Sequence, residues 1–205
     1  MNRESIEKTL KSLQKNRINA VYYDTVDEAK EYILKSVTKE QSIGIGGSIT
    51  IQDMNLHQSL MEQGNKVSWH WLETTPEGKK AALEKAGKAD VYLTSANAIT
   101  LTGEIINVDG VGNRVASMIY GPKKVIILCG INKICNDMVD ALDRLRKQAS
   151  PPNAQRLNRK TPCAVTGECT DCDSPERICN VTTIIHKKPM QTDMEVVLIG
   201  ESLGY

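Results

Sequence analysis

Four cysteines form the most concentrated set of reactive side chains in the sequence. They are spaced Cys163-x5-Cys169-x2-Cys172-x6-Cys179 in a chain of 205 residues that holds six cysteines. The surrounding segment, residues 161–179, has no hydrophobic periodicity, so burial of apolar surface cannot offset the entropy that it loses on ordering. We therefore expect something other than packing to fix this segment, and four thiolates that bind one metal centre would do so.

The spacing of these cysteines leaves three interpretations open. Zinc sites usually combine two short Cys-x2–4-Cys pairs, and only the pair Cys169 and Cys172 has that spacing. An iron–sulfur cluster accepts the wider outer spacings, although this run differs from the common ferredoxin motif. The sequence favours a [4Fe–4S] cluster, with zinc as the alternative and free thiols or redox-active disulfides as the third interpretation.

A second candidate site begins at the glycine pair Gly46-Gly47, which follows a short apolar run at residues 42–46. A strand, glycine turn and helix in succession let backbone N–H groups approach an anion closely, and the hydroxyls of Ser48 and Thr50 can add hydrogen bonds. A glycine pair alone is more often a tight turn than a phosphate-binding loop. Its place directly after a strand favours the binding role.

Polar side chains also follow two other apolar runs. Ser95 and Asn97 come after the run at residues 89–94, and Lys133 comes after the run at residues 124–129. In open α/β sheets, ligands bind outside the carboxyl ends of the parallel strands. We therefore expect these three residues to share one site with the glycine turn.

Arg114 stands at the start of a short predicted helix, after the turn Asp109-Gly-Val-Gly-Asn. The positive end of a helix disfavours a cation unless an anion is also present, so a bound carboxylate or phosphate would explain the residue. Asn113 and Arg114 are therefore candidates to hold the anion, with Lys133 as a second cation. The alternative is that Arg114 pairs with Asp109 or Glu104 and only braces the turn.

These candidates must be positioned by strands and helices that alternate along the chain. A capping box at Thr25 and Glu28 begins one helix, and Thr102-Gly103 at the middle of residues 98–109 predicts a hairpin or a bent strand pair beside the main sheet. Residues 137–149 have the spacing of an amphipathic helix, which we expect Ser150-Pro-Pro-Asn153 to end. The remaining predicted helices cover residues 3–15, 26–37, 49–63, 74–86 and 114–119, and the strands cover residues 19–23, 42–46, 66–71, 89–94, 124–129 and 194–199.

This alternation predicts an α/β fold with a mainly parallel sheet and helices on both faces. We expect one domain over residues 1–205, with a Cys-rich insertion at residues 161–180. The net charge of +1 and the pI near 7.6 give no electrostatic case for a nucleic-acid partner. Without a signal peptide or a run of about 18 apolar residues, we expect a cytoplasmic protein with a small ligand and no membrane partner. The histidines, His70 included, are interpreted as structural.

Several motifs resemble those of the LUD-domain, or lactate-utilisation, protein family. They are GIGGS at residues 44–48, LTG at residues 101–103, DGVGNRVASMIYGPKKVIILCGINKI at residues 109–134, and PCAVTGECTDC with the final GESLGY. The resemblance covers almost the whole chain and is strongest to the single-domain branch with the cysteine tail. It implies a Rossmann-like fold similar to that of ribose-5-phosphate isomerase, glucosamine-6-phosphate deaminase and the CoA transferases. It also implies a place in a multi-protein iron–sulfur system that oxidises L-lactate to pyruvate.

The leading hypothesis is a protein that binds a small anionic metabolite or a phosphate-bearing ligand at the strand ends. Its Cys-ligated cluster would support a redox step in organic-acid metabolism, with an iron–sulfur protein as redox partner. One alternative is a non-catalytic binding or regulatory protein with a structural zinc staple. Another is a CoA-transferase-like or isomerase-like enzyme that uses Glu104, because the CoA transferases that share this fold use a glutamate nucleophile. The predicted ligand-binding residues are Gly46, Gly47, Ser48, Thr50, Ser95, Asn97, Thr102, Gly103, Asn113, Arg114 and Lys133.

Overall fold

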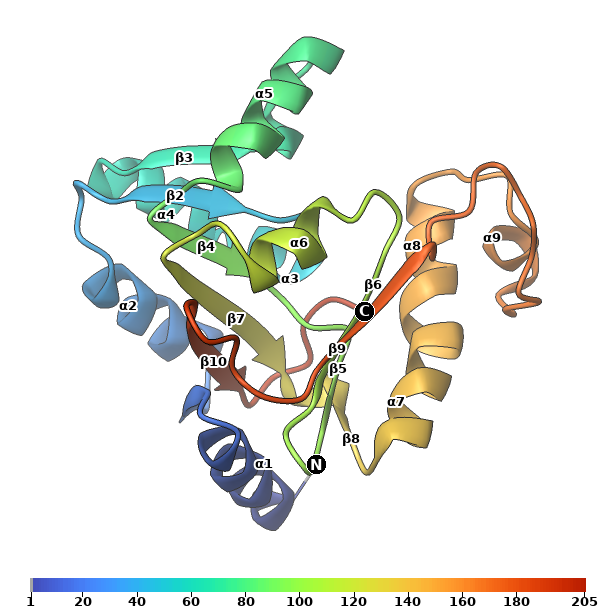
Figure 1. Cartoon of the computed structure of the whole chain (residues 1–205), viewed down its shortest axis with the longest axis horizontal. Helices are drawn as coiled ribbons and strands as arrows, with labels where there is room; N and C mark the ends of the chain where they lie inside the picture. Colours follow the sequence, from blue (N-terminus) through green and yellow to red (C-terminus); the bar gives the residue numbers. More distant parts are fainter. Residues whose placement is uncertain (1) are drawn as a thin grey trace.

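A six-stranded sheet with all strands parallel forms the centre of the computed structural model, which describes residues 2–205 (Figure 1). This sheet confirms the predicted α/β architecture. Parallel pairing places the carboxyl ends of all six strands along one edge. In spatial order the strands are β1 (Asn19–Tyr23), β10 (Asp193–Ile199), β7 (Lys124–Gly130), β4 (Val91–Thr94), β2 (Ser42–Ile45) and β3 (Lys66–Trp69).

Alternate residues of the central strands face opposite sides of the sheet and enter two separate cores. In β7, Val125 and Ile127 belong to the first core, whereas Ile126 and Leu128 belong to the second. This alternation explains the continuous apolar runs in the sequence, because both faces of each strand are covered. The first core includes residues of α1 (Arg3–Lys15) and α6 (Asn113–Ile119), and the second includes residues of α2 (Val26–Ser36), α3 (Ile49–Asp53) and α4 (Leu56–Gln63).

Two local features fix the ends of helices that pack on the sheet. The predicted capping box is present, because the Thr25 hydroxyl accepts from the Glu28 N–H and the Glu28 carboxylate accepts from the Thr25 N–H. Helix α5 (Pro76–Ala86) ends against β2, where a Cβ at Gly44 would lie 2.3 Å from the Ala86 carbonyl oxygen. Only glycine allows that close approach.

A second, four-stranded sheet lies beside the first. It contains the predicted hairpin of β5 (Ala98–Thr100) and β6 (Ile105–Asp109), flanked by β8 (Ile134–Cys135) and β9 (Val181–Ile185). The two flanking strands were not predicted, because β8 has only two residues and β9 lies in a polar region of the sequence. One face of this small sheet adds Ile99 and Ile105 to the first core, and the other contacts α7 (Met138–Arg144).

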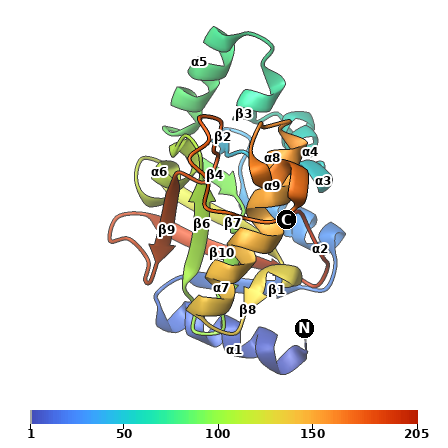
Figure 2. The same ribbon diagram turned by 90° about the vertical axis from the view of Figure 1, so that its right-hand side faces the viewer.

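The helix that begins with α7 does not end at Ser150, so the prediction of a stop there was wrong. It continues through a π-helical turn, η3 (Leu145–Ala149), into α8 (Ser150–Arg156), as Figure 2 shows. Pro151 and Pro152 stand in the first turn of α8, where a missing N–H costs little. This continuation carries Asn153 and Arg156 to the carboxyl edge of the main sheet.

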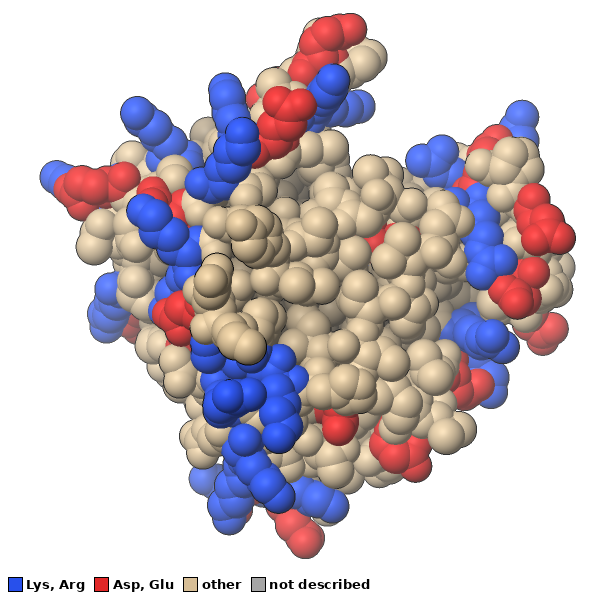
Figure 3. All heavy atoms as spheres, viewed as in Figure 1, with Lys and Arg blue, Asp and Glu red and all other residues tan. Residues whose placement is uncertain are grey.

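The Cys-rich segment is mostly irregular, apart from the short α9 (Pro162–Thr166), which lies beside α8 (Figure 2). Strand β3 is shorter than predicted, because its last residues form the turn η1 (His70–Leu72). In the view of Figure 3, acidic and basic side chains lie mainly at the rim of the molecule, over α1, α5 and the region of α9. Within residues 2–205, no helix is long and apolar enough to span a lipid bilayer.

Candidate functional site

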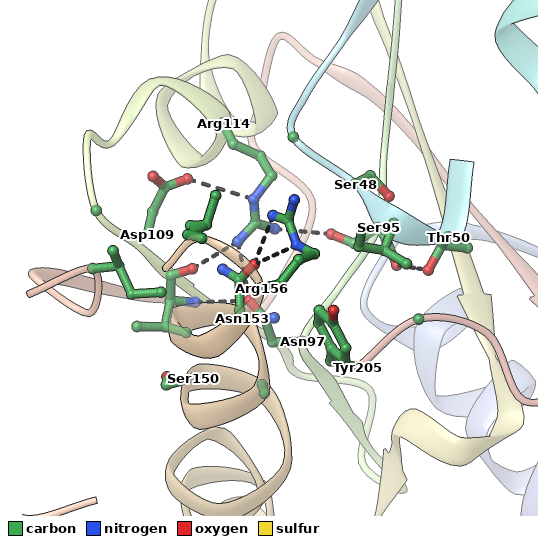
Figure 4. Close-up of a pocket in the computed structure, with 18 of the residues that line it drawn as sticks. Ser48, Thr50, Ser95, Asn97, Asp109, Arg114, Ser150, Asn153, Arg156 and Tyr205 are labelled. Carbon is green, nitrogen blue, oxygen red and sulfur yellow. Dashed lines mark hydrogen bonds and ion pairs between the residues drawn. The ribbon is translucent and has the colours of Figure 1, made fainter. Parts of the chain in front are cut away.

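A pocket of about 290 Å³ lies at the carboxyl edge of the main sheet. Its walls come from the loops that follow β2, β3, β4 and β7, from α8, and from the last two residues of the chain. Figure 4 shows that side chains of α8 and of the strand loops point into the same space. Of the predicted ligand-binding residues, this pocket is lined by Gly47, Ser48, Thr50, Ser95, Asn97, Asn113, Arg114 and Lys133.

Lys133 is a buried cation at one end of this pocket. It lies in the turn η2 (Ile131–Lys133) directly after β7, and only 3% of its surface is exposed. Its Nζ atom donates to the Thr50 and Ser95 hydroxyl oxygens, each at 2.9 Å, and it forms no ion pair with any carboxylate of residues 2–205. Burial without a counterion disfavours the charged form and lowers the pKa of Lys133 to about 8.

The guanidinium of Arg114 is fully committed to neighbouring protein groups. Nη1 lies 3.0 Å and 2.5 Å from its two acceptors, Nη2 lies 3.0 Å and 2.7 Å from its two acceptors, and Nε lies 3.4 Å from a carboxylate oxygen. Four of the five N–H donors of the guanidinium are thus hydrogen-bonded to the protein, and Nε faces the Asp109 carboxylate, so the protein occupies the positions that a ligand would need. The acceptors are the Ser95 carbonyl and Asn107 Oδ1, Asn97 Oδ1 and the Val108 carbonyl, and Asp109 Oδ2.

This geometry matches the bracing role that was the alternative for Arg114, with Asp109 and not Glu104 as the acidic partner. Arg114 joins the loop after β4 to the end of β6, and so holds the backbone that presents Ser95 and Asn97. Gly46 belongs to the same arrangement, because a Cβ there would lie 2.9 Å from Arg114 Cγ. Gly46 therefore makes room for the arginine stem and does not itself line the pocket.

The turn of the β5–β6 hairpin also lies outside the pocket. Glu104 accepts from the hydroxyls of Thr100 and Thr102, and these bonds outweigh burial and lower its pKa. Gly103 packs on α1, where an added Cβ would lie 2.9 Å from the Leu13 nitrogen. About four residues of extended strand, roughly 13 Å, separate Glu104 from the pocket end of β6. The structure therefore does not bring Thr102, Gly103 or Glu104 to the predicted site.

Arg156 is the main pocket residue that the sequence prediction missed. Its Nε and Nη2 donate to Asn153 Oδ1 at 3.2 Å and 2.8 Å, and its guanidinium carbon lies 5.0 Å from the centre of the Trp71 ring. It forms no ion pair with a carboxylate in residues 2–205. The signal that could have revealed it is helical spacing past the two prolines, which would have placed Asn153 and Arg156 on one helix face.

His70 also lines the pocket, although its sequence context predicted only a structural role. Burial, helped by the charge of Lys79, lowers the pKa of His70 and favours the neutral ring. Its Nδ1 atom is buried and has no hydrogen-bond partner within residues 2–205. A neutral imidazole with an unused ring nitrogen can donate to or accept from a ligand, depending on its tautomer.

The charged residues of the pocket do not balance. Among the ion pairs of residues 2–205, Lys133, Arg156 and Arg159 have no carboxylate partner, whereas Asp109, the acidic side chain in the wall, is already paired with Arg114. Cations that lack counterions raise the local potential and attract anions, the more so where one of them, Lys133, is buried. The arrangement is thus chemically suited to a carboxylate or phosphate group.

The four cysteines of residues 161–179 are free and partly buried. Arg177 organises their backbone, since it donates to the carbonyls of Cys172 at 2.8 Å and Cys179 at 3.3 Å. Burial, together with the nearby Cys169 and Cys172, raises the pKa of Cys179. Within residues 2–205, no three Cys, His, Asp or Glu side chains are arranged to hold a metal ion. Four thiols are a suitable donor set for iron or zinc, but they do not converge on one point.

A second cavity, of about 440 Å³, connects this segment with the pocket region. Cys169 and Cys179 line it from one side and α7 lines it from the other. Val108 and Ser150 line both cavities. The cysteine segment is therefore adjacent to the pocket, which Ile178 of that segment also lines.

Comparison with known proteins gives a family and a fold. The family model described as "LUD domain" matches residues 6–199. A crystal structure of a DUF162 family protein from Deinococcus radiodurans has a TM-score of 0.56 and 15% sequence identity, and the match covers 97% of this chain and 99% of that chain. At this identity the likeness concerns the fold. No curated protein matches the sequence.

Proposed function

Because the chain belongs to the LUD domain family, which is associated with lactate utilisation, we propose that it binds a small organic anion or a phosphate-bearing ligand in this pocket. The observation that carries the proposal is the set of cations that line the pocket and have no carboxylate partner in the described part of the chain, namely Lys133, Arg156 and Arg159. A pocket of about 290 Å³ has room for a hydroxy or oxo acid and for a larger phosphorylated compound.

The side chains of the pocket would make charged and neutral contacts with the ligand. Arg156 stacks on Trp71 and is held by Asn153, so that Nη1 remains available for a carboxylate or phosphate oxygen. A guanidinium placed in this way binds such groups through charge-assisted hydrogen bonds. Ser48 and Asn97 add neutral polar contacts, and Arg114 supports the loop of Asn97 from behind.

Replacement of Arg156 by methionine should weaken anion binding by about 1.5–3 kcal/mol, the usual scale for a lost hydrogen bond to a charged group. The measurement is titration calorimetry, after a thermal-shift screen of lactate, pyruvate, inorganic phosphate and nucleotides on the wild-type protein. Arg146→Met is the matched control, because Arg146 is an exposed arginine of the same continuous helix that does not line the pocket. Equal affinity of the wild type and Arg156→Met for every anion would reject the proposed site.

We further propose that the four cysteines take up an iron–sulfur cluster, which would give the family's redox association a physical basis. The supporting observations are four partly buried thiols in a segment with little other packing, and their position next to the pocket across Val108 and Ser150. Cys163, Cys169, Cys172 and Cys179 would hold the cluster, and such a cluster supplies one-electron redox chemistry when bound. Binding requires these thiols to move together from their present arrangement.

Anaerobic purification should give a brown protein with about four iron and four sulfide per chain. Cys172→Ser should reduce the iron content, whereas Cys129→Ser should not, because Cys129 is a buried residue of β7. A colourless protein with stoichiometric zinc would instead support a binding or regulatory protein with a structural zinc staple. Metal-free protein in which an alkylating reagent modifies all four thiols would contradict both metal sites.

A further inference from the structure

The amine of Lys133 has an environment that differs from that of an ordinary anion-binding lysine. It is buried at the pocket wall, no carboxylate among residues 2–205 pairs with it, and its two hydrogen-bond acceptors are neutral hydroxyls. The final residues of the chain cover it: the Leu203 N–H donates to Asn132 Oδ1, and a Cβ at Gly204 would lie 3.4 Å from Nζ. A site of this kind stabilises the neutral amine relative to the ammonium ion.

The two hydroxyls are oriented to accept from Lys133. The Thr50 hydroxyl can donate to the Leu203 carbonyl and the Ser95 hydroxyl to the Ala96 carbonyl, each at 3.4 Å, and the two hydroxyl oxygens lie 3.3 Å from each other. In each of these arrangements both oxygens keep a lone pair that accepts from Nζ. A neutral amine has two N–H donors and one lone pair. With both donors used by Thr50 and Ser95, the lone pair is left for a group in the pocket.

We propose that Lys133 is a catalytic nucleophile that forms an imine with an aldehyde or ketone on an anionic substrate. The inference rests on the anion site proposed above and names the substrate class of that site. The Nζ lone pair forms a bond to the carbonyl carbon, and the carbonyl oxygen leaves as water with the two amine hydrogens, so the C=O bond is replaced by C=N. No oxidant or reductant is needed. Thr50 and Ser95 are positioning residues that orient the amine.

The charge balance of the pocket supports the same assignment. Arg156 and Arg159 can neutralise the acid group of the substrate, which leaves Lys133 free to act on its carbonyl. A lysine with a pKa of about 8 has, near neutral pH, a neutral fraction on the order of a hundredfold larger than that of an ordinary surface lysine. Desolvation of the amine is one of the ways in which proteins activate a lysine for attack on carbonyl groups.

Borohydride trapping tests the proposal, because it reduces an imine to a stable secondary amine. The full-length protein is incubated with pyruvate, dihydroxyacetone phosphate or acetone, reduced, and examined by intact mass and peptide mapping. We expect one adduct per chain on Lys133 with an anionic carbonyl compound and none with acetone at the same concentration. The pyruvate and dihydroxyacetone phosphate samples show whether the acid group is a carboxylate or a phosphate.

Two variants distinguish a role of Lys133 as a nucleophile from a role as a cation only. Lys133→Arg keeps a positive charge but cannot form the imine, so it should lose the adduct and retain stabilisation by anions. Lys66→Arg, at an exposed lysine of β3, should retain both. The mapping on wild-type protein decides the question even if Lys133→Arg fails to fold. If the label is spread over exposed lysines, or if no label appears while anions still stabilise the protein, the imine proposal is wrong and the anion site stands. Absence of both label and anion stabilisation overturns the anion site as well.

Discussion

Replacing Arg114 by methionine should destabilise the protein by about 3–5 kcal/mol, the scale for removing one partner of a buried, hydrogen-bonded ion pair. The substitution removes the cation that pairs with the Asp109 carboxylate, and it removes one of the two donors to the side-chain oxygens of Asn97 and Asn107, which keep a backbone N–H donor each. A largely buried carboxylate that loses its cation is left as an uncompensated charge. The loop after β4 would also lose its connection to β6.

Urea unfolding followed by circular dichroism would measure this loss. Arg156→Met is the matched control, since Arg156 is an exposed arginine with no ion pair in residues 2–205 and should change the free energy of unfolding by about 0.5 kcal/mol or less. Arg114→Met should therefore lose stability, whereas Arg156→Met should keep its stability and lose anion binding. A stable Arg114→Met protein that no longer binds anions would make Arg114 a ligand-binding residue.

Lys133 should make the stability of the protein depend on alkaline pH. Its pKa is about 8 in the folded protein and about 10.4 in the unfolded chain, so between these values the unfolded state binds more protons. Stability then rises with pH across this window. Below pH 8 the lysine is charged in both states and the cost of burying the charge is fully present. Deprotonation in the folded state removes that cost, which amounts to about 3 kcal/mol over the window.

The comparison with Lys133→Met isolates this contribution. Free energies of unfolding of both proteins, measured from pH 7 to pH 10.5, share the titration of all other groups, so their difference reports on Lys133. We expect the wild type to gain about 3 kcal/mol relative to the variant over this range. A constant difference would mean that the ammonium ion is solvated or paired in the folded protein, and would also weaken the case for a nucleophilic amine.

The sequence predicted the main sheet well because the relevant signals are local. Every residue from Val125 to Cys129 is buried, and such unbroken apolar runs identify strands that are covered on both faces. The capping box at Thr25 and Glu28 likewise depends on neighbours three residues apart. Placement of the site followed from the same signals, because parallel strands bring Ser48, Ser95 and Lys133 to one edge.

The features that the sequence did not predict depend on contacts between distant segments. Proline residues usually end a helix, yet here a π-helical turn precedes Ser150, the prolines stand in the first turn of α8, and the helix continues to Arg156. The role of Arg114 was undecided because its acceptors come from the loop after β4 and from β6, which meet only in the folded protein. Glu104 lies close to Arg114 in the sequence, yet the hairpin takes it to the opposite end of β6.

The position of β10 in the sheet has a consequence for biosynthesis. β10 lies between β1 and β7, with Val196 opposite both Ala20 and Ile127, yet it is the last strand in the sequence. On the ribosome, β1 is therefore made first of all the strands and has no partner until residues 193–199 have emerged. β7 keeps one edge open for the same period, and unpaired strand edges in nascent chains are prone to association with other chains. Pairing of β1 must thus wait for β10, so interruption of synthesis before residues 193–199 would favour aggregation or chaperone capture over folding.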